Sequence, residues 1–114
     1  MGKFNVAAPQ FIDLPADTTI DISFSEEYFI TKGGSFATIT VPIPDASADG
    51  VVLRFTSTSA QAHVITFTGS RLQNGVTINR TTATLANVRG ASIEVVARTG
   101  LWYVLSQSAA VTYA

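Results

Sequence analysis

The chain has 114 residues, a net charge of −1 and no cysteine, which fits one domain around one hydrophobic core without disulfides or cysteine-based metal sites. Its two lysines and five arginines form no basic tract, which argues against a nucleic-acid partner. No stretch approaches the ~18 apolar residues of a membrane span, and the N-terminus lacks the pattern of a signal peptide. We therefore expect no membrane partner, and a protein that stays where it is synthesised until it assembles.

Residues 1–17 are irregular and contain Pro9 and Pro15. They predict an extended N-terminal arm that becomes ordered only when it packs on a neighbouring molecule; a frayed terminus fits the same pattern. The apolar residues that would make this contact are Phe4, Val6, Phe11, Ile12 and Leu14. Residues 18–114 are expected to form a single β domain.

From Thr18 onward, apolar and polar residues alternate, which indicates half-buried β-strands. The expected strands are 18–24, 28–31, 37–41, 51–57, 63–67, 81–86, 91–98, 101–107 and 111–113. Turn signals separate them, notably Gly33-Gly34, Asn74-Gly75 and Arg89-Gly90. The spacing predicts an all-β fold: an antiparallel β-sandwich or barrel, jelly-roll-like, with about eight short strands.

No group of residues predicts catalysis, a cofactor or a bound metal. His63 is the only histidine, and no second histidine or cysteine exists to complete a metal site around it. Glu26 and Glu27 are adjacent, so on a strand they point to opposite faces and in a turn they both face solvent. Asp45 and Asp49 lack the further ligands of a calcium loop. We expect a protein that is not an enzyme.

The large side chains within the expected strands are predicted to anchor either the core or an interface with another molecule. Trp102 and Tyr103 have rings that could stack on a sugar, but they lie in an apolar strand, which favours anchoring. The full set of predicted anchors is Phe24, Phe55, His63, Phe67, Trp102 and Tyr103.

Charged residues make up only 13% of the chain, against a usual share of about a quarter. Because the cores of protein interfaces are depleted in charge, this shortage predicts that part of the surface is covered by another molecule. The alternative is a surface kept soluble by 15 threonines and 10 serines.

Part of the chain resembles small β-rich proteins encoded among the structural genes of tailed bacteriophages. The resemblance covers roughly residues 50–107. It lies in the segments Leu53-Arg54-Phe55-Thr56-Ser57-Thr58-Ser59-Ala60-Gln61-Ala62-His63-Val64-Ile65-Thr66, Asn87-Val88-Arg89-Gly90-Ala91-Ser92-Ile93 and Gly100-Leu101-Trp102-Tyr103-Val104-Leu105-Ser106.

Such proteins are similar to capsid decoration (cement) proteins. The resemblance implies a homotrimer that sits on the outside of the phage head, with the major capsid protein as partner. In such an assembly the apolar residues of the N-terminal arm would contact the capsid or a neighbouring subunit, and the predicted anchors would lie in the core or at the trimer interface. It also implies a location in the virion after assembly in the host cytoplasm. Similar segments occur in tail-fibre and spike proteins, so the alternative is a receptor-binding β domain that recognises host surface glycan. A small hydrolase on a β-scaffold is a third, less favoured hypothesis.

Overall fold

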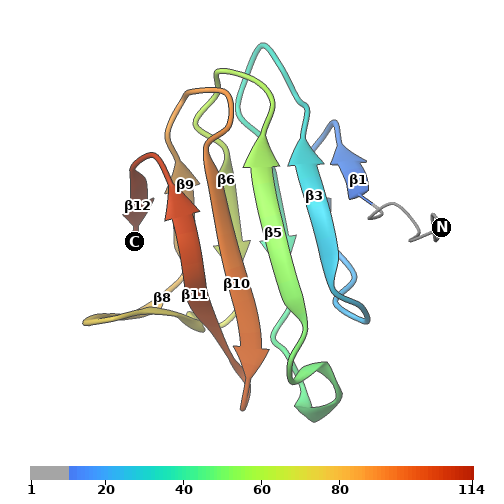
Figure 1. Cartoon of the computed structure of the whole chain (residues 1–114), viewed down its shortest axis with the longest axis vertical. Coiled ribbons are helices and arrows are strands. Elements are labelled where there is room, and N and C mark those ends of the chain that lie inside the picture. Colours follow the sequence, from blue (N-terminus) through green and yellow to red (C-terminus); the bar gives the residue numbers. More distant parts are fainter. Residues whose placement is uncertain (1–10) are drawn as a thin grey trace, which may run out of the picture.

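Strands make up nearly all the regular structure of residues 11–114, the part of the chain described by this computed structural model. The predicted all-β sandwich is confirmed (Figure 1). The first strands are β1 (Phe11–Leu14), β2 (Thr18–Thr19), β3 (Glu26–Ile30), β4 (Thr38–Val41), β5 (Val52–Ser57) and β6 (Val64–Phe67). The later strands are β7 (Leu72–Asn74), β8 (Thr77–Arg80), β9 (Thr82–Leu85), β10 (Ser92–Arg98), β11 (Leu101–Ser108) and β12 (Val111–Tyr113). A short 3-10 helix, η1 (Ala46–Ala48), precedes β5.

The strands form two sheets. The seven-stranded sheet has the order β1-β3-β5-β10-β11-β7-β8, and the five-stranded sheet has the order β12-β9-β6-β4-β2. From β1 to β6 the chain crosses to the other sheet after every strand, so successive strands within a sheet are parallel. From β9 onward most pairs are antiparallel. The sheets are therefore mixed rather than purely antiparallel, and the twelve strands exceed the eight expected.

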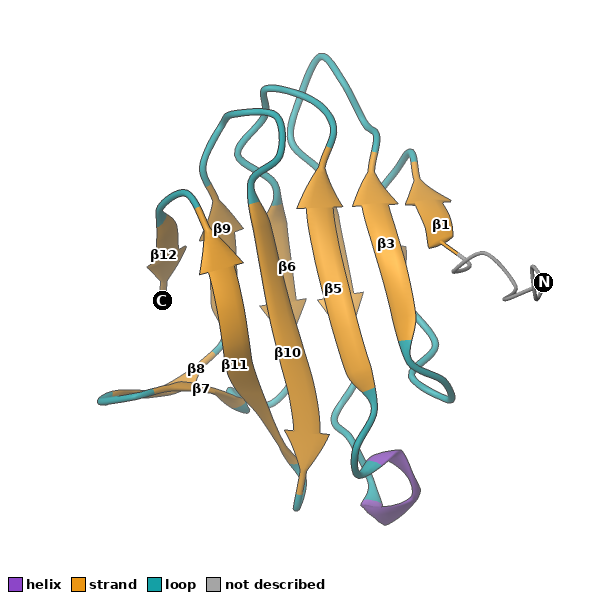
Figure 2. Ribbon diagram, in the orientation of Figure 1, coloured by secondary structure: helices purple, strands orange, loops and turns teal. Residues whose placement is uncertain are grey.

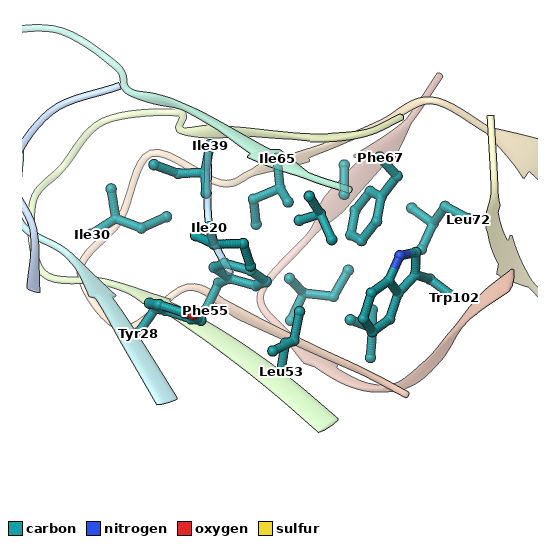
Figure 3. Packing of buried hydrophobic residues seen from close by; sticks show 14 of the residues in the cluster. Ile20, Tyr28, Ile30, Ile39, Leu53, Phe55, Ile65, Phe67, Leu72 and Trp102 are labelled. Atoms are coloured by element: carbon teal, nitrogen blue, oxygen red, sulfur yellow. The ribbon is translucent and has the colours of Figure 1, made fainter. Parts of the chain in front are cut away.

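The core lies between the two sheets, where every second residue of the central strands points inward. Leu53 and Phe55 from β5 face Ile39, Ile65 and other residues of the five-stranded sheet (Figure 3). The ring of Phe55 also stacks on Tyr28 at a centroid distance of 5.2 Å. Most inward positions of both sheets are aliphatic or aromatic, with Ser57 at the end of β5 as a buried polar exception, and this matches the period-2 pattern of the sequence.

The predicted strand 18–24 is interrupted. Only Thr18–Thr19 pair, as β2, and the backbone then turns at Asp21. The Asp21 carboxylate accepts hydrogen bonds from the Ser23 amide at 2.9 Å and the Ser23 hydroxyl at 2.7 Å. Such local bonds compete with strand pairing. Ile20 still reaches the core, but Phe24 lies beyond the turn and is 73% exposed, so it is not a core residue of this chain.

Residues 11–14 differ from the expected arm, because they form β1 at the edge of the seven-stranded sheet. β1 pairs in parallel with β3, and Leu14 is buried in the core. Phe11 lies edge-on to Phe29 of β3, with ring centroids 5.2 Å apart. Ile12 is partly exposed. Phe4 and Val6 lie outside the described residues.

Candidate interaction surfaces

The outer face of the five-stranded sheet is covered mainly by threonine side chains, and we call it the threonine face. Its outward positions are Thr19 in β2, Thr38 and Thr40 in β4, Val64 and Thr66 in β6, Thr82 and Thr84 in β9, and Thr112 in β12. The register aligns them in rows: Thr19, Thr40, Thr66 and Thr82 form one row, and Thr38, Val64, Thr84 and Thr112 form the next. Each row presents hydroxyl and methyl groups at the spacing of neighbouring strands, about 4.8 Å.

The threonine face carries no charge at any of these described strand positions. The chain has few charged residues, and the strand positions of this face have none. The side chains of the central strands shield one another, so most of these threonines are only partly exposed. A partner that covers this face therefore removes little water from polar groups and buries no ion.

The outer face of the seven-stranded sheet is different, because charges cross it in a row. Arg54 of β5 lies in register between Glu27 of β3 and Glu94 of β10. Its guanidinium nitrogens lie 3.5 Å from a Glu27 carboxylate oxygen and 3.3 Å from one of Glu94. About half of the Arg54 side chain is exposed, so these ion pairs contribute little to folding. They hold the three side chains in one arrangement.

A hollow opens beside this row, and we call it the acidic hollow. It is lined by Phe24, Ser25, Glu26, Glu27, Val52, Arg54 and Glu94. Three carboxylates and one guanidinium give it a formal charge of −2, while Phe24 and Val52 supply apolar surface. The Ser25 hydroxyl accepts a hydrogen bond from the Val52 amide at 2.9 Å, which fixes one wall to β5.

The hairpin of β7 and β8 projects from the side of the sandwich, beyond β11 (Figure 2). Val76 at its turn is fully exposed and Ile78 is 55% exposed. The side chain of Gln73 crosses the hairpin: its amide donates to the Asn79 side chain at 3.0 Å and its oxygen accepts from the Asn79 backbone at 3.2 Å. This pair holds Asn79 in a left-handed conformation (φ 55°), so the hairpin is pre-shaped and still presents an apolar tip.

His63 is fully buried between the sheets, and its hydrogen bonds define its protonation. Its Nδ1 accepts from the Ala37 backbone amide at 2.9 Å, so this nitrogen carries no proton. Its Nε2 lies 2.9 Å from the Ser59 hydroxyl oxygen. That hydroxyl donates to the Lys32 carbonyl at 2.6 Å, so it must accept from Nε2. The ring is neutral, and both of its nitrogens hold loops together.

We expect the His63 site to make stability depend on pH. Burial, with a smaller contribution from the charge of Lys32, lowers the pKa of His63 below its ordinary value of about 6.5. The unfolded chain therefore takes up a proton below about pH 6.5 while the folded chain does not. Stability should fall as the pH drops below that value, by up to about 1.4 kcal/mol per pH unit. Urea unfolding between pH 8 and pH 5 measures this slope, and His63→Asn should flatten it.

The predicted anchors separate into two groups. Phe55, His63, Phe67 and Trp102 are fully buried within the chain. Phe24 and Tyr103 lie on the surface, so for them only the trimer-interface prediction is left. Sequence reasoning missed the threonine face and the projecting hairpin. The repeated Thr-x-Thr pattern at 38–40 and 82–84 and the Asn74-Gly75 turn were the available signals.

Within residues 11–114, no three histidine or acidic side chains gather closely enough to hold a metal ion. No helix in that part of the chain has the length and apolar character needed to cross a membrane. Searches with the sequence against models of known protein families and against curated proteins find no match.

Proposed function

We propose that this chain is a structural virion protein, a homotrimeric capsid decoration protein that binds the outside of a phage head and stabilises the shell. The observation that carries the proposal is the charge-free threonine face. Covering charged side chains is costly unless each finds a partner, whereas threonine methyl groups gain from burial and their hydroxyls adapt to either donors or acceptors. A neutral, ordered face of this kind suits permanent attachment.

The size of the threonine face supports attachment as a trimer. Five strands about 4.8 Å apart, of which the central three are four residues long and the outer two are shorter, span at most roughly 300 Å². A stable protein interface covers about 800 Å² on each partner. One copy alone therefore falls short, while three linked copies reach that area and gain from one another, because the second and third contacts form within one complex.

The resemblance to phage structural proteins supports the same function. Its segments span β5 to β11, which include central strands of both sheets. The alternative, recognition of host glycan, draws on exposed aromatic rings. Trp102 is fully buried, so its ring cannot stack on a sugar. Of the two aromatic residues considered for sugar binding, Trp102 and Tyr103, only Tyr103 is exposed.

Thr66→Lys tests the proposal at the centre of the threonine face. It places a charge where the partner would lie, so we expect affinity for heads to fall by more than about tenfold, while the melting temperature of the protein hardly changes. The measurement is co-sedimentation with purified heads of a tailed phage whose genome carries this sequence.

Thr56→Lys is the matched control, because Thr56 points outward from β5 on the opposite sheet. This variant should keep wild-type affinity for heads. Equal binding by the wild type and both variants would show that the threonine face does not contact the head. Binding to host cells without binding to heads would favour the receptor-binding alternative.

A further inference from the structure

We infer that the β7–β8 hairpin of one copy inserts its tip into the acidic hollow of the next copy, and that this contact closes the trimer. The inference rests on the proposed function for its trimeric state. The contact uses two surfaces that differ from each other and from the threonine face.

The hairpin has the composition of a docking element. Its tip, Val76, is fully exposed, and Ile78 adds apolar surface close to it. The segment 70–80 carries Arg71 and Arg80 at the base of the hairpin and no acidic residue. Arg71 donates to the Gly100 carbonyl of its own chain at 3.4 Å, so the exposed Arg80 is the cation placed to meet a partner. The bonds between Gln73 and Asn79 fix its shape before contact, which lowers the entropy lost on binding.

The acidic hollow complements the hairpin in both respects. Phe24, 73% exposed, and Val52 form an apolar wall that would receive Val76. The formal charge of the lining residues is −2, which opposes the positive charge of Arg80 at the base of the hairpin. Both exposed apolar surfaces are covered by this one contact, and the contact offers a reason why Phe24 is held outside the core.

The placement of the two surfaces leads to a ring. The hairpin projects beyond β11 (Figure 1), whereas the hollow lies over β3, β5 and β10, so a chain does not fill its own hollow. A contact between two different patches is head-to-tail, and such contacts form a closed ring when the rotation between copies permits. Three copies give the ring that the proposed function needs.

Val76→Asp is the first test, read by sedimentation equilibrium of the full chain. The wild type should have three times the 12.0 kDa of one chain, and the variant should dissociate at concentrations at least tenfold higher. Val88→Asp is the control, because Val88 is an exposed valine away from the hairpin and the hollow. A wild-type monomer, or a variant trimer as stable as the wild type, overturns the inference.

Charge exchange separates a self-contact from a contact with another protein. Arg80→Glu alone and Glu26→Arg alone should each weaken the trimer about tenfold, and the chain that carries both should recover it, because the side chains at positions 80 and 26 are then again of opposite charge. No recovery in a double variant with a normal melting temperature contradicts the inference. Head binding is measured separately: heads that still bind a dissociated variant leave the proposed function in place, whereas a trimer that binds no heads overturns the function and not this contact.

Discussion

Trp102→Ala should lower the free energy of unfolding by about 4 kcal/mol, the largest effect that we expect from a single substitution. Trp102 is fully buried and lies beside Phe67, with ring centroids 6.4 Å apart, and beside Leu72 (Figure 3). Its indole Nε1 donates to the carbonyl of Pro42 at 3.1 Å, which ties β11 to the end of β4 in the opposite sheet. The substitution leaves a cavity and an unpaired carbonyl together.

Urea unfolding followed by circular dichroism measures this loss. A domain of this size has a total stability of about 5–15 kcal/mol, so the variant should be close to unfolded at 37 °C. Tyr103→Ala is the control, because the adjacent aromatic side chain points outward and is 40% exposed. It should lose only about 1 kcal/mol. Equal losses at the two positions would show that the indole does not join the two sheets.

His63→Ala should cost about 3 kcal/mol at pH 8, the second largest effect. The variant removes a buried ring, leaves the Ala37 amide without its acceptor, and takes away the Nε2–H that donates to the Ser59 hydroxyl. An unpaired buried donor alone costs about 1–3 kcal/mol. The effect should be felt at both loops that the ring connects, the one before β4 and the one before β6.

His63→Asn separates the hydrogen bonds from the volume of the ring. The asparagine oxygen lies close to where Nδ1 lies in histidine, so it can still accept from the Ala37 amide. We expect it to recover about 1 kcal/mol relative to alanine. Identical stabilities of the alanine and asparagine variants, measured by denaturant unfolding, would mean that the bond to Ala37 contributes nothing.

The sequence predicted which segments are strands much better than how they pair. Residues 51–57 and 101–107 were expected as strands and nearly match β5 and β11. Side chains alternate in the same way in parallel and antiparallel strands. The alternation of apolar and polar residues therefore could not show that the strands from β1 to β6 pair in parallel within each sheet. Asp21 ended a strand through a local hydrogen bond that alternation does not reveal.

The surfaces were harder to predict because they join distant parts of the chain. Thr38, Thr66 and Thr84 lie on three neighbouring strands of one sheet, and only the register brings them onto one face. The acidic hollow likewise combines Phe24 with Glu94. The segment Ser57–His63, on which part of the phage resemblance rests, forms the crossing from β5 to β6, where Ser57 and Ser59 make hydrogen bonds within the loop. These two residues of the motif therefore stabilise the loop between β5 and β6.

The most direct test of the central claim is to count copies bound to heads. Purified heads lacking decoration are titrated with the protein, and the bound copies are quantified together with the melting temperature of the heads. We predict saturation at a fixed number of copies divisible by three, with a higher melting temperature of the heads at saturation. Binding that never saturates, or no binding at concentrations where the protein is trimeric, would contradict it.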